Sequence, residues 1–174
     1  MILLAEAANH TKRGGQDLIG GLDVHVNRNF FGRQIESFEA PLDLPFLREA
    51  SLSSGTKQSF HGVFIRAPVV EKLLPNVKGE QREESFKDGT VVAPSKQVPC
   101  SDFVSEPVEV LTVLPGRSKS LRQQLDTAEL EQQGDIVMVQ QGNVLGTSFH
   151  PELTNDARIH VWWLKQVKVA IESC

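Results

Sequence analysis

The sequence has few cysteines, no long apolar run and no excess of basic residues. It contains two cysteines, Cys100 and Cys174, which is too few for a disulfide framework, so we expect a reducing compartment and a cytosolic protein. No apolar run approaches the roughly 18 residues that a membrane span needs. The net charge of -4 is not the basic excess that is typical of nucleic-acid binding. We therefore expect neither a membrane nor a nucleic acid as partner.

Length and composition favour one ordinary globular domain. The chain has 174 residues, of which 40% are hydrophobic and 23% are charged, and this is enough for a substantial core. Two stretches, at about 75–107 and 116–134, are polar and are interpreted as insertions, the first as an inserted loop. We predict a single domain over residues 1–174 that carries these two insertions.

Hydrophobic periodicity predicts a chain made largely of strands. Alternation of apolar and polar residues, or short apolar runs between turn signals, indicates strands at 22–26, 38–44, 60–67, 108–114, 136–139 and 143–149. Two prolines place the second of these at a sheet edge. His25 lies on the polar side of the first strand, so we expect it to face solvent outside any active site.

Helices are predicted mainly at the two ends. Residues 1–9 combine strong helix formers, and a short helix is also expected near 121–130. One helical stripe predicts a closing helix that packs on the core, and it consists of Ile159, Trp163, Val167, Ala170 and Ile171. We expect Thr154, Asn155 or Asp156 to begin that helix.

The stretch 144–154 carries the pattern with the most chemistry. Pro151 disfavours the α region for the residue before it, so the apolar strand should end with the imidazole of His150 at its tip. Glu152 follows two residues later, which in extended backbone is the same side. A carboxylate beside an imidazole orients it, as in the base and orienter of a catalytic triad. Without a nucleophile, the pair would be a surface ion pair worth at most about 1 kcal/mol.

Three motifs make the chain resemble a known family. Residues 146–154, Gly-Thr-Ser-Phe-His-Pro-Glu-Leu-Thr, closely resemble the segment with the catalytic His and Glu of class I glutamine amidotransferases. Two further segments look like the glutaminase subunit of pyridoxal 5'-phosphate synthase, the vitamin B6 enzyme. They are Leu-Asp-Val-His-Val-Asn-Arg-Asn-Phe-Phe-Gly-Arg-Gln at 22–34 and Gly-Val-Phe-Ile-Arg-Ala-Pro at 62–68. The resemblance covers nearly the whole chain apart from the two insertions.

The resemblance implies an α/β fold with an open, mostly parallel sheet flanked by helices. It also implies that family members carry a further N-terminal part, with a glycine-rich loop and a strand, sharp turn and helix that present a nucleophilic Cys in a Gly-Thr-Cys-Ala-Gly context. That context does not occur in this sequence. We therefore expect a fold without its N-terminal strands and nucleophile elbow, in which a strand edge and a helix face are left uncovered.

The same resemblance implies roles for individual residues. His150 corresponds to the general base and acid that serves the Cys, and Glu152 to its orienter, in the hydrolysis of L-glutamine to glutamate and ammonia. Arg28, Ile65 and Arg66 match residues that line the glutamine site, where the fork of an arginine suits a carboxylate. The expected partner is the (β/α)8-barrel subunit of the synthase, which receives the ammonia. Neither a cofactor nor a metal is expected.

Three hypotheses remain open, and whether this chain is itself an enzyme differs between them. The first is a truncated form of an active glutaminase, and it is favoured because the chain retains Arg28, Arg66, His150 and Glu152 together. The second is a non-catalytic subunit that docks to the synthase and regulates it. The third is a different hydrolase that uses Cys100 or a serine, but no Gly-x-Ser-x-Gly elbow occurs in the sequence.

Overall fold

Short strands make up most of the protein in the computed structural model, which describes residues 1–10, 16–28, 37–49, 59–77, 81–94, 106–115 and 134–172. The strands are β1 (Ala5–Asn9), β2 (Leu22–Asn27), β3 (Ser37–Leu42), β4 (Phe60–Ile65), β5 (Val69–Leu73), β6 (Thr90–Val92), β7 (Glu109–Leu114), β8 (Asp135–Gln141) and β9 (Val144–Thr147). The helices are α1 (Pro45–Glu49), α2 (Arg82–Ser85) and α3 (Arg158–Glu172), and there are two 3-10 turns, η1 (Ile2–Leu4) and η4 (Pro151–Leu153).

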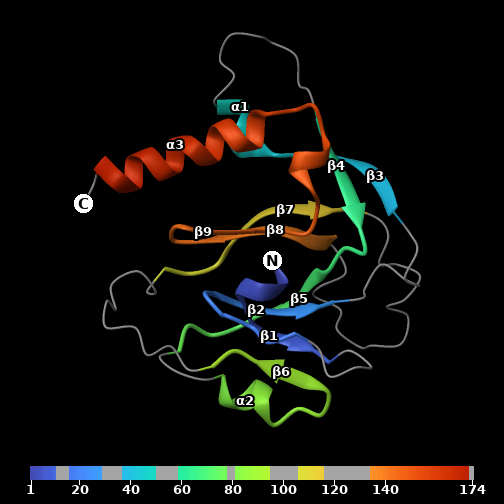
Figure 1. Cartoon of the computed structure of the whole chain (residues 1–174), viewed down its shortest axis with the longest axis vertical. Helices are drawn as coiled ribbons and strands as arrows, with labels where there is room; N and C mark the ends of the chain where they lie inside the picture. Colours follow the sequence, from blue (N-terminus) through green and yellow to red (C-terminus); the bar gives the residue numbers. More distant parts are fainter. Residues whose placement is uncertain are drawn as a thin grey trace.

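Seven of the described strands form one open sheet. Its order is β6-β1-β2-β5-β8-β7, and β9 also pairs with β8. The remaining strands, β3 and β4, pair with each other in a separate two-stranded sheet, which agrees with the edge position predicted for β3. Figure 1 shows α1 and α3 at one end of the molecule and α2 with β6 at the other. The predicted α/β class, with a central sheet and flanking helices, is confirmed.

The sheet is not mostly parallel within the described residues, so that expectation is wrong there. Only β1 and β2 pair in parallel, whereas the other ladders are antiparallel. A tight turn can join antiparallel strands directly, and β8 and β9 are joined in this way, whereas most of the other antiparallel pairs bring together strands that are distant in the sequence. In the predicted turn between β8 and β9, Gly142 has a φ of +54°, a conformation that glycine adopts without steric cost.

The amino-terminal helix predicted at 1–9 is wrong, because η1 and β1 occupy this stretch. Strand β1 lies between β2 and β6, and the side chains of Ala5, Ala7 and Ala8 are fully buried. Burial on both faces outweighs the modest helix preference of alanine. The carboxylate of Glu6 is also buried and accepts a hydrogen bond from the Gly21 N–H at 2.8 Å.

The first polar stretch is not simply a loop, so the interpretation of residues 75–107 needs correction. It contains α2 and β6, and β6 pairs with β1 at the edge of the sheet. The chain continues to follow the sheet after β6, since the Ala93 N–H donates to the Glu6 carbonyl at 2.8 Å. The rest of that stretch around Cys100, and the second stretch with its predicted helix near 121–130, lie mostly outside the described residues.

Two adjoining clusters of buried side chains form the core. One is aromatic at its centre: the Phe64 ring stacks on Phe38 with centroids 4.7 Å apart, and Phe60 and Phe64 each lie 5.8 Å from Phe149. The other cluster gathers Leu22 and its neighbours on β2 with apolar side chains of β1 and β5. Phe149 directly precedes His150, so the packing of Phe149 in the aromatic cluster fixes the backbone that leads into the candidate site.

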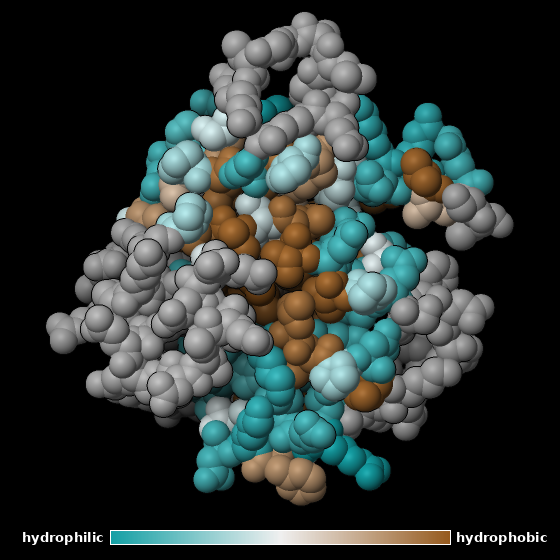
Figure 2. All heavy atoms as spheres, turned by 180° about the vertical axis from the view of Figure 1, so that it is seen from behind, coloured by the Kyte–Doolittle hydropathy of each residue, from teal (hydrophilic) through white to brown (hydrophobic). Residues whose placement is uncertain are grey.

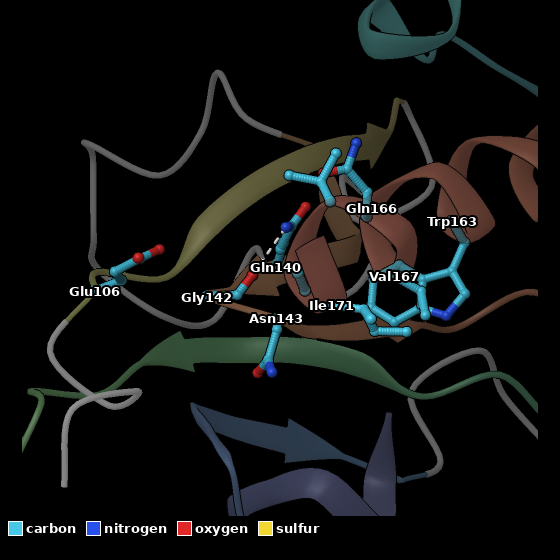
Figure 3. Close-up of a pocket in the computed structure, with 10 residues that line it drawn as sticks. Glu106, Gln140, Gly142, Asn143, Trp163, Gln166, Val167 and Ile171 are labelled. Atoms are coloured by element: carbon cyan, nitrogen blue, oxygen red, sulfur yellow. Dashed lines mark hydrogen bonds between the residues drawn. The ribbon is translucent and has the colours of Figure 1, made fainter. Parts of the chain in front are cut away.

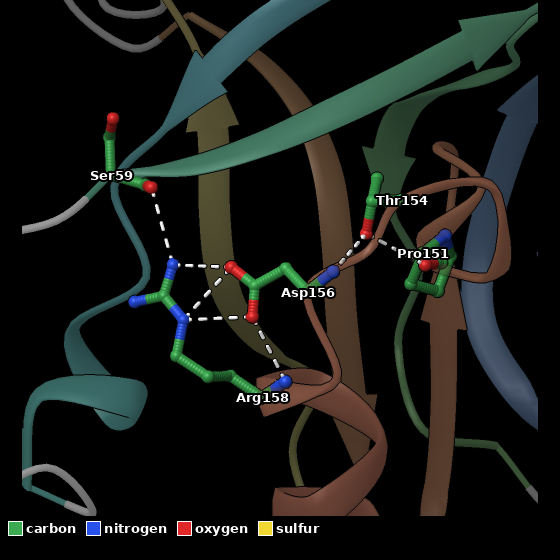
Figure 4. A network of polar contacts seen from close by, with 5 residues as sticks. All are labelled: Ser59, Pro151, Thr154, Asp156 and Arg158. Carbon is green, nitrogen blue, oxygen red and sulfur yellow. Dashed lines mark hydrogen bonds and ion pairs between the residues drawn. The ribbon is translucent and has the colours of Figure 1, made fainter.

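The closing helix begins as predicted. The Asp156 carboxylate accepts a hydrogen bond from the Arg158 backbone N–H at 3.0 Å and pairs with the Arg158 guanidinium. This guanidinium also donates to the Ser59 carbonyl at 3.3 Å (Figure 4). The pair lowers the pKa of Asp156 below its usual range. Asp156 thus caps α3 and Arg158 ties its start to the segment that leads into β4.

The predicted core stripe of α3 is only partly buried. Ile159 is buried, and Trp162 packs on Phe46 with ring centroids 4.4 Å apart. Further along the helix, Val167 is 37% exposed and Ile171 is 70% exposed. Of the predicted stripe, only Ile159 is buried, Trp163 is half-buried, and the prediction is wrong for the second half, which meets no core in the described structure.

Candidate functional site

His150 follows the end of β9, and its backbone is bound to strand β4. The Ser148 N–H donates to the Val137 carbonyl and the His150 N–H to the Val63 carbonyl, each at 2.8 Å. Phe149, between them, is 3% exposed and fills the aromatic core. His150 itself has an extended backbone, with φ -104° and ψ 90°, and Pro151 then begins η4. Strand β9 ends at Thr147, so the imidazole lies three residues beyond the strand rather than at its tip, although His150 has the extended backbone that a following proline favours.

The imidazole and the carboxylate predicted to work together do meet. His150 Nδ1 lies 2.8 Å from Glu152 Oε1. The backbone that joins them is the 3-10 turn η4, rather than the extended chain from which their proximity was predicted. The hydrogen bond to His150 lowers the pKa of Glu152, so the carboxylate is ionised at neutral pH. An ionised acceptor at Nδ1 favours the tautomer with its proton there, which leaves Nε2 for proton transfer.

The pair faces solvent. The side chain of His150 is 41% exposed and that of Glu152 is 58% exposed. In catalytic triads, by comparison, the orienting carboxylate is buried and water is excluded from the reacting groups. The described residues therefore bring the two side chains together but do not enclose them.

Ile65 and Arg66 lie at the same rim as His150. Both follow Val63, whose carbonyl accepts the His150 N–H, and both are exposed. Arg66 has a φ of +48°, a conformation that is uncommon for residues other than glycine and is often associated with functional sites. Two of the three predicted substrate-binding residues therefore follow, by two and three positions, the residue whose carbonyl holds the His150 backbone.

Arg28 is placed differently. It is 6% exposed, its Nη2 donates to the Gln16 carbonyl at 2.9 Å, and its N–H donates to Asn9 Oδ1 at 2.7 Å. Burial lowers the pKa of this arginine, and its Nε has no hydrogen-bond partner among the described residues. The neighbouring Asn27 pairs with Val69, so Arg28 lies near the start of β5. Arg28 is thus buried near the start of β5, whereas Arg66, three residues before β5, is exposed.

A second histidine–carboxylate pair was missed from the sequence. His25, expected to face solvent, is only 12% exposed, and its Nδ1 lies 2.7 Å from Oε2 of the buried Glu84. Lys72 and Lys87 reach Oε1 of the same carboxylate at 3.0 and 2.7 Å. Burial raises the pKa of Glu84, but the hydrogen bonds from Lys87, His25 and Lys72 lower it more, to about 2. No local pattern signals these contacts, because His25 and Glu84 are 59 residues apart.

The described residues contain no cluster of three or more His, Cys, Asp or Glu side chains that could hold a metal ion. Among the same residues, no helix is both long enough and apolar enough to cross a membrane. Cys100 and Cys174 lie outside the part of the chain that the structure describes. The candidate functional groups among the described residues are thus the His150 imidazole, the Glu152 carboxylate and the guanidinium groups of Arg28 and Arg66.

Comparison with known proteins gives a consistent result. The SNO glutamine amidotransferase family matches the chain over residues 1–106 and 95–169. The chain is 36% identical to an Arabidopsis thaliana protein named probable pyridoxal 5'-phosphate synthase subunit PDX2, over 97% of this chain and 55% of that protein. It is 32% identical to the pyridoxal 5'-phosphate synthase subunit PdxT of Moorella thermoacetica, over 87% of this chain and 50% of that protein.

A solved structure is also similar. It is described as a crystal structure of glutamine amidotransferase, and it superposes with a TM-score of 0.54 at 32% sequence identity. The match covers 95% of this chain and 55% of the other. The chain therefore spans about half the length of the relatives that it matches.

Proposed function

This chain belongs to the SNO glutamine amidotransferase family, and on that basis we propose that it supplies the base and orienter of a glutaminase that serves pyridoxal 5'-phosphate synthase. The observation that carries the proposal is the 2.8 Å contact between His150 Nδ1 and Glu152 Oε1. The names of the Arabidopsis and Moorella relatives support the choice of synthase. The reaction is the hydrolysis of L-glutamine to glutamate and ammonia.

His150 moves the protons in this reaction. Its Nε2 accepts the proton of a thiol as the sulfur attacks the side-chain amide carbon of glutamine, and the proton then passes to the departing ammonia as the carbon–nitrogen bond breaks. The same nitrogen next activates water, which releases glutamate from the thioester. Glu152 holds the imidazole by Nδ1 and stabilises its protonated form. The thiol must come from polypeptide other than the described residues.

Arg28, Ile65 and Arg66 are proposed to bind glutamine. Arg66 and Ile65 are exposed at the rim beside His150, where a substrate amide must lie to react. An arginine fork suits the α-carboxylate of an amino acid. Arg28 would serve from its buried position, because its Nε has no hydrogen-bond partner among the described residues and is a donor that a bound group can satisfy.

The proposed partner is the (β/α)8-barrel synthase subunit in the cytosol, to which the ammonia passes. A second candidate function is a non-catalytic subunit that docks to the synthase. It is favoured by the exposure of the His150–Glu152 pair among the described residues. Binding to the synthase without any glutamate release under the conditions described below would support this second function.

Replacing Glu152 with glutamine tests the orienting role. Glutamine keeps an acceptor near His150 Nδ1 but removes the charge, so we expect kcat for glutamate release to fall about 10²-fold with little change in KM. The assay uses this chain with the synthase subunit and with the part of the Arabidopsis relative that this chain does not match. Glu172→Gln is the matched control, because Glu172 is an exposed carboxylate on α3 that pairs only with Lys168 in the described structure. Equal kcat values for the two variants would exclude an orienting role.

A further inference from the structure

An open groove runs beneath the second half of α3. Its helix wall presents Trp163, Val167, Ala170 and Ile171, and its opposite wall is the turn between β8 and β9, with Gln140 and Asn143 (Figure 3). The groove has a volume of about 770 Å³. Of the described residues that line it, only Glu106 carries a charge. Uncharged polar side chains, Gln140, Asn143 and Gln166, also line the groove, so its apolar surface comes from the helix.

The helix wall has the pattern of a buried face. Trp163, Val167 and Ala170 follow one another at spacings of four and three residues, which places them on one side of the helix. Such a stripe normally packs against a core. The first half of α3 does so through Ile159 and Trp162, but in the second half Val167 and Ile171 remain exposed.

Two further parts of the described surface are also left uncovered by the described residues. Among the described strands, β9 pairs with β8 and with no other strand, so its outer edge is open to pairing. Figure 2 shows a broad band of apolar side chains on the back of the molecule. Monomeric proteins rarely expose large contiguous apolar patches unless another polypeptide covers them.

We propose that this groove is the docking surface for the part of the glutaminase that the relatives have and this chain does not match. The inference rests on the proposed function. In the solved glutamine amidotransferase, the region similar to this chain is only 55% of the polypeptide, so nearly half of that protein has no counterpart in this chain. Two parts of one compact domain bury apolar faces against each other, and the groove is an apolar helix face with nothing packed on it among the described residues. The occupant is therefore a complementing polypeptide with an apolar strand or helix face.

Co-expression with the unmatched part of the Arabidopsis relative tests the surface directly. We expect a one-to-one complex by sedimentation, and slower amide hydrogen exchange over residues 163–171 when the complex forms. Val167→Asp should weaken the complex at least tenfold, because the carboxylate would be buried without a partner. Val161→Asp is the matched control: Val161 lies on the same helix, is 49% exposed and does not line the groove. Far-UV circular dichroism establishes that both variants keep the fold.

The docking proposal and the proposed function can fail independently in this experiment, because complex formation is measured separately from glutamate release. A complex that depends on Val167 but releases no glutamate supports the groove and contradicts the proposed function. Three results would contradict the proposal that the groove is a docking surface. They are the absence of a complex, equal weakening of the complex by Val167→Asp and Val161→Asp, and slower exchange over 163–171 that arises from self-association of this chain without the added polypeptide.

Discussion

Phe64→Ala should lower the free energy of unfolding by about 3–5 kcal/mol, the usual cost of removing a buried phenylalanine. The ring is fully buried, stacks on Phe38 and lies 5.8 Å from Phe149. Its removal leaves a cavity that neighbouring rings cannot fill without leaving their own contacts. The neighbouring Val63 anchors the His150 backbone, so we also expect any activity of the site to fall.

Urea unfolding followed by far-UV circular dichroism measures the effect. Phe86→Ala is the matched control, because Phe86 is 85% exposed and its removal should change the unfolding free energy by no more than about 0.5 kcal/mol. If both variants unfold at the same urea concentration, the aromatic cluster is not the core that supports the site.

Glu84→Gln should cost about 2–3 kcal/mol of stability. The ionised carboxylate is 1% exposed and is bound by His25, Lys72 and Lys87, and these contacts lower its pKa from 4.5 to about 2. A shift of this size corresponds to roughly 3 kcal/mol. The two lysines are about half exposed, so solvent screening reduces the figure somewhat. Glu83→Gln is the control, since this neighbouring glutamate is exposed.

The same carboxylate predicts a pH dependence. Because folding lowers the pKa of Glu84, its stabilising contribution is complete above the unfolded value of 4.5 and is lost as the pH falls toward 2. The unfolding free energies of the wild type and Glu84→Gln should therefore converge between about pH 5 and pH 2. A difference that stays constant over this range would mean that the carboxylate is not held in its charged form.

The sequence was most informative where local rules decide the structure. The pairing of His150 with Glu152 was predicted because a proline and then a carboxylate follow the histidine, and the β8–β9 turn was predicted because glycine tolerates the positive φ that Gly142 adopts there. The start of α3 was found through the capping preference of Asp156. In each case the residues that determine the conformation lie within a few positions of one another.

The failures have a common physical cause. Strand β1 was predicted as a helix because its alanines favour helices. In the structure β1 pairs with β2 and β6 along its two edges, and its alanines are fully buried. Glu84 attracted no attention, because two of its three partners, His25 and Lys72, come from distant strands. The second half of the α3 stripe was assigned to the core, although its partner surface is not among the described residues. Contacts between distant segments decide these features, and local sequence does not encode them.

The most direct test of the account is glutamate release from glutamine by this chain in the presence of the synthase subunit, with and without the unmatched part of the Arabidopsis relative. We expect glutamate release only when that part is added, and we expect His150→Ala to lower the rate of release by about 10³-fold or more. Release by the chain and the synthase alone that disappears in His150→Ala would contradict this expectation, because a nucleophile would then exist within this sequence. In that case Cys100 would be the first residue to replace.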